Sequence, residues 1–261
     1  METHETLLFE VNGPLATVTL NRPEARNAMS NQMVGELARC FETLAGDAGA
    51  EVRAIVLRAA GSVFCAGGDV RDLRSLETPE ESDATLERLD TLLRAVNEAP
   101  QVVVVRIQGA AMGGGLGLVC VSDVAIAGER VTFGLPETRL GVAPSLISPY
   151  ILTRVGFTQA RRLMLTGSRV SASEARDIGL VHEVVPDDQL DQRVEAVVSD
   201  ILRCAPRALR ECKRLLFGVA NGSVTLSDRA ALLRRLRSSE EAQAGMLAFL
   251  SKQPAPWERQ P

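Results

Sequence analysis

Histidine is scarce in this sequence, and cysteine occurs without the spacing of a metal site. The only histidines, His4 and His182, lie far apart in the chain. A zinc site brings several such ligands together, so we expect no bound metal. The cysteines are odd in number, form no Cys-x-x-Cys pair and mostly lie among apolar residues. We therefore expect buried free thiols in a reducing compartment; the five are Cys40, Cys65, Cys120, Cys204 and Cys212.

The sequence also lacks an excess of positive charge and any long apolar run. Its 29 Lys and Arg residues against 33 Asp and Glu residues give a net charge of −4, which argues against nucleic acid or an anionic membrane as the main partner. No apolar run reaches the roughly 18 residues of a membrane span, and the acidic start, Met1 to Glu5, is unlike a signal or transit peptide. We expect a soluble, cytoplasmic protein with one substantial core and an appendage.

Strand-like and helix-like segments alternate through the first part of the chain. Two short apolar runs flank Asn12-Gly13-Pro14 and predict a hairpin, and Ser30 is an N-cap for a helix with apolar residues from Met33 to Leu44. Further buried strands alternate with turns and helices, which predicts an α/β fold; they span 54–58, 102–107, 124–127 and 131–134.

The last part of the chain has a different pattern. From Asp187 onward no strand pattern remains, and apolar residues recur at helical spacing. We therefore expect a core over residues 1–190 and an all-helical region over 191–261. A polar, acidic stretch from Arg71 to about Ala84 is predicted to form a mobile lid or loop.

Three segments after strands carry the most chemical information. Two are glycine-rich turns, Phe64 to Asp69 and Met112 to Gly117, and the third, Gly134 to Thr138, holds the carboxylate of Glu137. Turns with little side-chain bulk let backbone N–H groups approach a ligand oxygen closely. If both turns converge on one carbonyl, they form a hole for an oxyanion, with Glu137 as a nearby proton carrier.

In these segments the chain resembles the crotonase family of enoyl-CoA hydratases and isomerases. Asn21 to Ala28 is similar to an N-terminal signature of the family, and 165–167, 172–175 and 179–181 are similar to a later one. The resemblance covers nearly the whole chain. It implies a spiral of ββα units, an acyl-CoA thioester substrate with no separate cofactor, and a homotrimer or a hexamer built of two trimers. The C-terminal helices would mediate the trimer contacts.

The resemblance also implies roles for single residues. The oxyanion donors would be the N–H groups of Gly68 and Gly114, each contributing roughly 3 kcal/mol. Glu137 would be the general acid/base, with a pKa raised by burial. Coenzyme A would lie along Arg26, the Ala28 backbone and Ala66, and Lys252 of the same or a neighbouring subunit would reach a phosphate.

The chain departs from the best-known hydratases at Gly117, where they carry a second glutamate. Two mechanisms remain open: Glu137 alone exchanges protons for water on one face, or it moves a proton between carbons as in an isomerase. With 140–149, the segment around Gly117 is similar to the branch that hydrates 3-methylglutaconyl-CoA. We expect Gly117 to leave room beside the β-carbon for a methyl group. A third reading, a non-enzymatic RNA-binding member, is disfavoured because no basic stripe is present.

Overall fold

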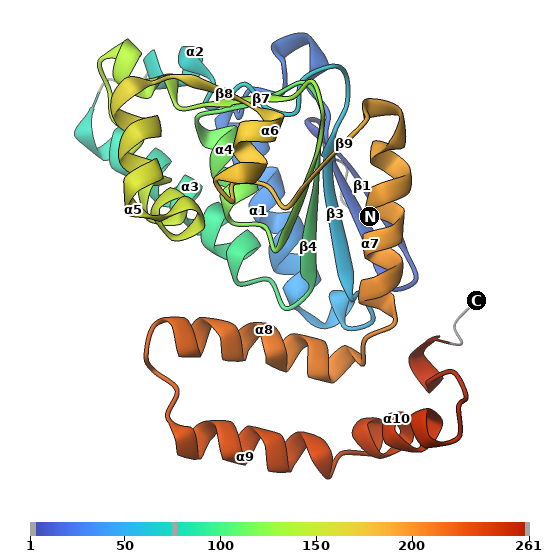
Figure 1. Cartoon of the computed structure of the whole chain (residues 1–261). Coiled ribbons are helices and arrows are strands. Elements are labelled where there is room, and N and C mark those ends of the chain that lie inside the picture. Colours follow the sequence, from blue (N-terminus) through green and yellow to red (C-terminus); the bar gives the residue numbers. More distant parts are fainter. Residues whose placement is uncertain (1–3, 75–77, 259–261) are drawn as a thin grey trace.

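Two β-sheets form the framework of the molecule (Figure 1). The computed structural model describes residues 4–74 and 78–258. The six-stranded sheet has the order β1-β2-β3-β4-β6-β9, and the smaller sheet has the order β5-β7-β8. The strands are β1 Leu7–Asn12, β2 Leu15–Leu20, β3 Ala54–Ala59, β4 Val102–Ile107, β5 Ala110–Met112, β6 Val124–Gly128, β7 Thr132–Gly134, β8 Arg169–Ser171 and β9 Glu183–Val185.

The large sheet begins with the expected hairpin and continues in parallel. β1 and β2 pair antiparallel, with Leu7 opposite Leu20, and each later neighbour is parallel to the strand before it. Parallel strands joined by helices are buried on both faces, which explains the almost continuous valine run of β4. The α/β class expected from the sequence is confirmed.

Helices cover both faces of the large sheet. On one face, α1 (Asn31–Ala45), α3 (Pro79–Asn97) and α4 (Gly114–Cys120) join the main hydrophobic core. On the other face, α7 (Leu190–Leu202) packs on the outward side chains of the strands. α5 (Ser148–Thr166) and α6 (Ala172–Asp177) lie beside the smaller sheet. Ser30 caps α1 as predicted, because its hydroxyl accepts the N–H of Met33.

The lid predicted over 71–84 is wrong for most of its length. α2 covers Val70–Arg74, and α3 already begins at Pro79. Thr78 and Glu81 form a reciprocal capping box at that start, and proline is favourable in a first helical turn. The remaining residues of the predicted loop, 75–77, lie outside the described residues.

The C-terminal helices extend away from the sheets, as Figure 1 shows. They are α8 (Pro206–Ala220), α9 (Leu226–Arg237) and α10 (Glu240–Leu250), and we call residues 206–250 the arm. The helical region expected from residue 191 thus divides in its packing: α7 belongs with the sheet, and the extended part begins after Leu202.

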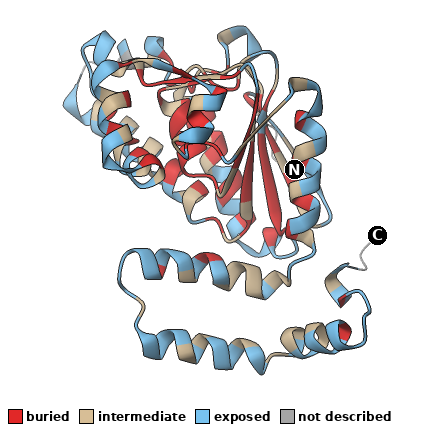
Figure 2. Ribbon diagram, in the orientation of Figure 1, coloured by how far each residue is buried: buried red, intermediate tan, exposed pale blue. Residues whose placement is uncertain are grey.

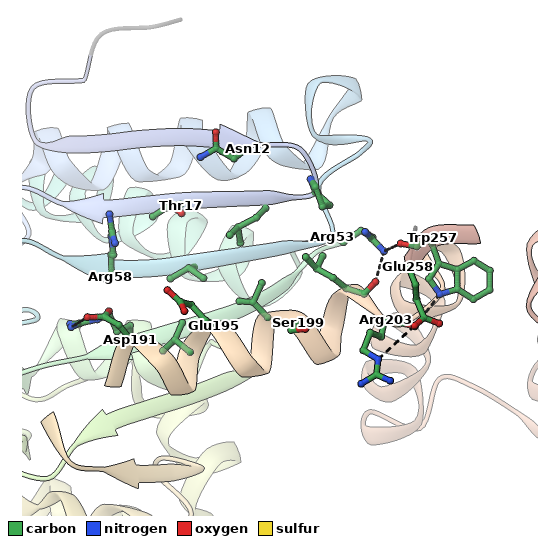
Figure 3. A pocket seen from close by; sticks show the side chains of 17 residues that line it. Asn12, Thr17, Arg53, Arg58, Asp191, Glu195, Ser199, Arg203, Trp257 and Glu258 are labelled. Carbon is green, nitrogen blue, oxygen red and sulfur yellow. Dashed lines mark hydrogen bonds and ion pairs between the residues drawn. The ribbon is translucent and has the colours of Figure 1, made fainter. Parts of the chain in front are cut away.

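The two ends of the arm are anchored to the rest of the chain. Near its start, the ammonium group of Lys213 donates to Asp123 Oδ2 at 2.6 Å. Beyond its end, the carbonyl of Trp257 accepts a hydrogen bond from Arg53, and its indole N–H donates to the carbonyl of Arg203 at 3.0 Å (Figure 3). The arm is therefore a loop of helices held at both ends.

No helix in the described part of the chain is both long and apolar enough to span a bilayer. Of the cysteines, Cys40, Cys65 and Cys120 are buried, whereas Cys204 and Cys212 are exposed, and none of the five forms a disulfide. Burial raises the pKa of Cys65 and of Cys120 to about 12, which keeps both as thiols.

Candidate active site

The two glycine turns lie face to face. A Cβ atom on Gly114 would stand 3.8 Å from the nitrogen of Gly68, and one on Gly113 would stand 3.8 Å from Cα of Gly67. Gly67 and Gly113 both have positive φ, of 101° and 49°, which side chains disfavour. A Cβ on Gly67 would also come within 3.0 Å of the Met112 carbonyl oxygen. Glycine is thus required for the turns to approach each other.

The N–H of Gly68 is directed by a hydrogen bond on the other side of its peptide group. The Gly67 carbonyl accepts the N–H of Met29 at 2.8 Å. Because a trans peptide is planar, the N–H of Gly68 points in the opposite direction, away from Met29. This amide donates to no described residue, so it is available to a ligand.

The N–H of Gly114 is directed in the same way. The carbonyl of Gly113 points into α4, where it accepts the N–H groups of Leu116 and Gly117 at 2.9 and 3.1 Å. The Gly114 amide therefore points out of the helix end, and within the described residues it has no acceptor. Two unengaged amides from different turns thus lie next to each other.

Glu137 lies beside these amides. It sits on a short 3₁₀ helix, η3 (Pro136–Leu140), directly after β7. A Cβ on Gly113 would be 2.7 Å from Glu137 Oε1, and Glu137 Oε2 is buried without a hydrogen-bond partner among the described residues. Burial raises the pKa of Glu137, although a hydrogen bond from its own backbone N–H opposes the change. The raised pKa agrees with the expectation for a general acid/base.

η3 is attached to α5, which fixes where Glu137 stands. The hydroxyl of Thr138 donates to the Met164 carbonyl at 3.1 Å, and the Arg139 guanidinium donates to the Thr166 carbonyl at 3.3 Å. On the other side, the N–H of Gly113 donates to the Gly134 carbonyl at 3.0 Å, just before η3. The carboxylate and the second glycine turn are therefore parts of one hydrogen-bonded assembly.

The room expected beside Gly117 is already filled. A Cβ on Gly117 would lie 2.5 Å from Cγ2 of Ile147 and 3.6 Å from Cδ2 of Leu93. The prediction of open volume is therefore wrong, because Ile147 occupies the space that a larger residue at 117 would take. Ile147 belongs to the segment 140–149, but no local signal in that segment marks it as the neighbour of Gly117. The place of the missing second glutamate is apolar.

The residues expected to hold coenzyme A divide into two groups. Arg26, Ala28 and Ala66 lie together beside the first turn: the N–H of Ala66 donates to the Arg26 carbonyl at 3.1 Å. Lys252 follows α10 at the end of the arm, and α10 lies at the opposite end of the molecule from α2 (Figure 1). Within one chain, the structure does not bring Lys252 to Glu137.

Two further contacts escaped the sequence analysis. Met29 touches Gly114, since a Cβ there would be 2.4 Å from its terminal methyl carbon. Arg22 pairs with Asp69, the residue after Gly68, at 3.3 Å. The segment 21–28 was recognised as a family signature, but nothing local in it shows that it packs behind the first turn.

A large cavity lies elsewhere in the molecule. It measures about 890 Å³ and lies on the outer face of the large sheet, between β2, β3, α7 and the tail around Trp257 (Figure 3). Arg53, Arg58 and Asp191 are among its lining residues, and none of the predicted site residues is. In the described part of the chain, no three His, Cys, Asp or Glu side chains are grouped as metal ligands.

Comparisons with known proteins agree with this architecture. The family model for enoyl-CoA hydratase/isomerase matches residues 10–260. A probable enoyl-CoA hydratase of Bacillus subtilis is 33% identical over 242 residues, which cover 91% of this chain and 93% of that protein. The structure of Pseudomonas aeruginosa AtuE has a TM-score of 0.94 at 42% identity and covers 98% of this chain and 100% of its own.

A second solved structure, an enoyl-CoA hydratase/isomerase from Marinobacter aquaeolei, has a TM-score of 0.92 at 40% identity over 98% of this chain and 100% of its own. These similarities extend over both sheets and the C-terminal helices. They confirm the ββα fold with C-terminal helices that the sequence resemblance implied.

Proposed function

This chain belongs to the enoyl-CoA hydratase/isomerase family, and from that premise we propose that it hydrates a β-branched glutaconyl-CoA, or dehydrates the product. The example we put forward is 3-methylglutaconyl-CoA, with 3-hydroxy-3-methylglutaryl-CoA on the other side of the reaction. One observation carries the chemistry. The buried, unpaired Oε2 of Glu137 belongs to a carboxylate that lies beside the free amides of Gly68 and Gly114.

The amides act on the thioester carbonyl. When water adds to the β-carbon, negative charge moves onto the thioester oxygen as an enolate, and two preorganised N–H donors stabilise that charge. The donors bind the enolate more strongly than the ground-state carbonyl, so they lower the barrier. The same stabilisation applies when an α-proton is removed in the reverse direction.

Glu137 carries the proton. In hydration, its ionised carboxylate accepts a proton from the attacking water as the C–O bond forms, and then delivers it to the α-carbon of the enolate. In dehydration it takes the α-proton and protonates the departing hydroxyl. Both transfers occur on one face, because one carboxylate serves both. Because burial raises the pKa of Glu137 toward the working pH, the same side chain can both accept and donate the proton.

The apolar surroundings of Gly117 support a substrate with its own carboxylate. A second glutamate here would repel the distal carboxylate of a glutaconyl chain, whereas Ile147 and Leu93 bring no charge. The β-methyl group would meet the side chain of Ile147 rather than an empty space.

Double-bond isomerisation is the second candidate, and the presence of a single carboxylate favours it. An isomerase needs no water-activating group: Glu137 takes a proton from one carbon and returns it to another while the amides hold the same enolate. The two functions therefore use identical residues and differ only in whether water takes part.

Coenzyme A binding and assembly complete the proposal. Arg26, the Ala28 backbone and Ala66 would hold the nucleotide part of coenzyme A beside the first turn. Lys252 would reach a phosphate in a neighbouring subunit of a homotrimer or hexamer, which its distance from the site of its own chain supports. Large apolar side chains exposed on the arm support the same assembly.

A panel of thioesters tests the function. The purified protein is incubated separately with 3-methylglutaconyl-CoA, crotonyl-CoA and a 3-enoyl-CoA, and the mass of each product is measured by mass spectrometry. Hydration adds one water, whereas isomerisation leaves the mass unchanged and moves the double bond. We expect the water adduct of the methylglutaconyl ester to form fastest. Faster hydration of crotonyl-CoA would overturn the substrate assignment, and products of unchanged mass alone would establish the isomerase.

A further inference from the structure

An ion pair stands directly behind the first glycine turn. Both terminal nitrogens of Arg22 lie 3.3 Å from Asp69 Oδ2, and the two side chains are only 18% and 7% exposed. Arg22 Nη1 also donates to the carbonyl of Ala28 at 2.6 Å. One guanidinium therefore joins the residue before Met29 to the residue after Gly68.

This junction lies where the direction of the Gly68 amide is set. The N–H of Met29 donates to the Gly67 carbonyl, and the N–H of Asp69 donates in turn to the Met29 carbonyl at 3.0 Å. Any movement of Met29 relative to the turn rotates the peptide group between Gly67 and Gly68. That peptide group carries the proposed oxyanion donor.

Arg22 is itself fixed by a buried side chain. Its backbone N–H donates to Asn27 Oδ1 at 2.8 Å, and Asn27 is completely buried. The amide nitrogen of Asn27 donates to the carbonyls of Ala60 and Val63, both at 2.8 Å. The guanidinium thus projects from a stretch of backbone that is tied to the loop preceding the first turn.

The pair also controls charge beside the enolate. Asp69 follows Gly68 directly, and an unpaired carboxylate there would oppose negative charge on the thioester oxygen. Burial alone would raise the pKa of Asp69, but hydrogen bonds from Arg71 and Arg22 outweigh it and hold the pKa below its usual value. Asp69 is therefore ionised, and its charge is balanced by arginine.

We propose that Arg22 and Asp69 are positioning residues: their ion pair aims the N–H of Gly68 at the thioester oxygen and keeps the Asp69 carboxylate neutralised during enolate formation. The inference rests on the function proposed above. Removal of Arg22 has two consequences: the donor is loosened, and the buried Asp69 carboxylate keeps only Arg71, whose side chain is 80% exposed, as its cation. Removal of both partners relieves the second.

The test compares Arg22→Met with a matched ion pair on the far side of the sheet. Arg106 pairs with Asp191, and its side chain is 17% exposed, close to that of Arg22, whereas Asp191 is 67% exposed. We expect Arg22→Met to lower kcat by roughly 10- to 100-fold, a range typical of a displaced catalytic group, with KM changed less than about threefold. Arg106→Met is expected to keep kcat within about twofold. The double variant Arg22→Met/Asp69→Asn is expected to be faster than Arg22→Met.

A spectroscopic measurement separates positioning from folding. Butyryl-CoA labelled with ¹³C at the carbonyl is saturated and does not react, and hydrogen bonds to its carbonyl lower the infrared stretching frequency. We expect the bound band to move back toward the free value in Arg22→Met and to stay in place in Arg106→Met. If Arg22→Met does not fold, Arg22→Lys carries the test with a smaller loss, since lysine keeps the charge but cannot bridge both acceptors.

Each outcome is decisive. A slow Arg22→Met with an unmoved band and no recovery in the double variant shows a merely structural role and overturns the inference. An Arg22→Met that behaves like Arg106→Met does the same, while the proposed function stands. A wild-type protein that neither turns over enoyl-CoA esters nor shifts the band overturns the proposed function, and the inference with it.

Discussion

Two regions of the chain differ in how far their apolar side chains are buried. One is the arm, and the other is the part up to Leu202, which we call the body. In the body, the large apolar residues of the strands and of α1 are mostly buried (Figure 2), and the exposed ones include a group on α5, namely Leu152, Phe157 and Leu165. On the arm, Phe249 is 83% exposed and Leu250 is 78% exposed, and α9 has no buried residue at all. The residues that the arm buries are Lys213, Gly218 and Ala248.

The contrast distinguishes a region that buries apolar side chains within the chain from a region that leaves them exposed. Outside α5 and the segment 140–142, the body buries most of its large apolar side chains, and its buried polar groups without a partner among the described residues include Glu137 Oε2, in the proposed site. The arm has amphipathic helices whose apolar faces are left largely exposed by the described part of the chain. Exposed apolar patches of this kind mark surfaces that bind other proteins. We therefore propose that the body holds the chemistry and that the arm binds a second copy of the chain.

The largest effect is expected in the body, from Glu137→Gln. The amide has the shape of the carboxyl group but cannot exchange a proton, so kcat is expected to fall by roughly 10²-fold or more. Affinity for an acyl-CoA, measured by calorimetry, is expected to change little, and so is the oligomer size. A variant with near-normal kcat would remove Glu137 from the mechanism.

The next effect is expected in the arm, from Leu247→Asp combined with Phe249→Asp. Burying a leucine or phenylalanine contributes about 1.5–3 kcal/mol, and a buried unpaired carboxylate costs more, so we expect the assembly to dissociate at micromolar concentration. Light scattering after size-exclusion chromatography gives the mass. Asn221→Asp, in the α8–α9 turn, adds one of the two negative charges of the double variant and still accepts the N–H of Ser223, so it is the control. An unchanged mass in the double variant would show that this face is not the interface.

Local signals in the sequence were enough to predict much of the secondary structure of the body. Ser30 and the helical spacing after it predict α1, and the order of strand, glycine turn and strand predicts both turns. Thr78 with Glu81 is also a local signal, a capping box, but the charged composition after Arg71 favoured a loop. The reason is physical: the first turns of α3 are exposed and polar, and its buried residues come only at Leu92, Leu93 and Val96.

The missing information concerns contacts between distant segments. Ile147 fills the space beside Gly117 from thirty residues away, and Met29 directs a peptide group at Gly67–Gly68. Neither contact leaves a periodic pattern or a turn signal in the sequence. The sequence also does not show that the arm is exposed. Its amphipathic spacing is equally typical of a helix that packs on the sheet of its own chain, as α7 does.

An intermediate effect is expected from restoring the second carboxylate in the body. Gly117→Glu alone would collide with Ile147, so the variant is combined with Ile147→Ala to make room. The new charge lies near the acyl chain and repels a distal carboxylate. We expect kcat/KM for 3-methylglutaconyl-CoA to fall at least about tenfold, or ~1.4 kcal/mol, relative to crotonyl-CoA. Ile147→Ala is the control, and an unchanged ratio between the two esters would show that position 117 does not face the acyl chain.

The smallest effect is a gain in stability from the same Glu137→Gln variant that loses activity. The buried Oε2 of Glu137 has no partner in the described structure, and an unsatisfied buried polar group costs about 1–3 kcal/mol. A neutral amide is easier to bury than a carboxylate, so we expect the free energy of unfolding of the ligand-free protein to rise by ~1 kcal/mol at neutral pH. Tm at fixed protein concentration would then rise by roughly 2–4 °C. No such gain is expected from replacing an exposed glutamate of the arm, such as Glu240→Gln.

The pH dependence of this gain distinguishes its cause. Burial raises the pKa of Glu137 above the unfolded value, which means that the folded protein prefers the protonated form. Below the unfolded pKa of about 4.3, both states are protonated and the wild type has no penalty. As pH rises through the folded pKa, the unfolded chain ionises more readily, so wild-type stability falls relative to Glu137→Gln. The difference in Tm between the two proteins should therefore be near zero at pH 4, grow with pH and level off above the folded pKa. A difference that is constant across this range would show that packing of the amide, and not the charge of Glu137, is responsible.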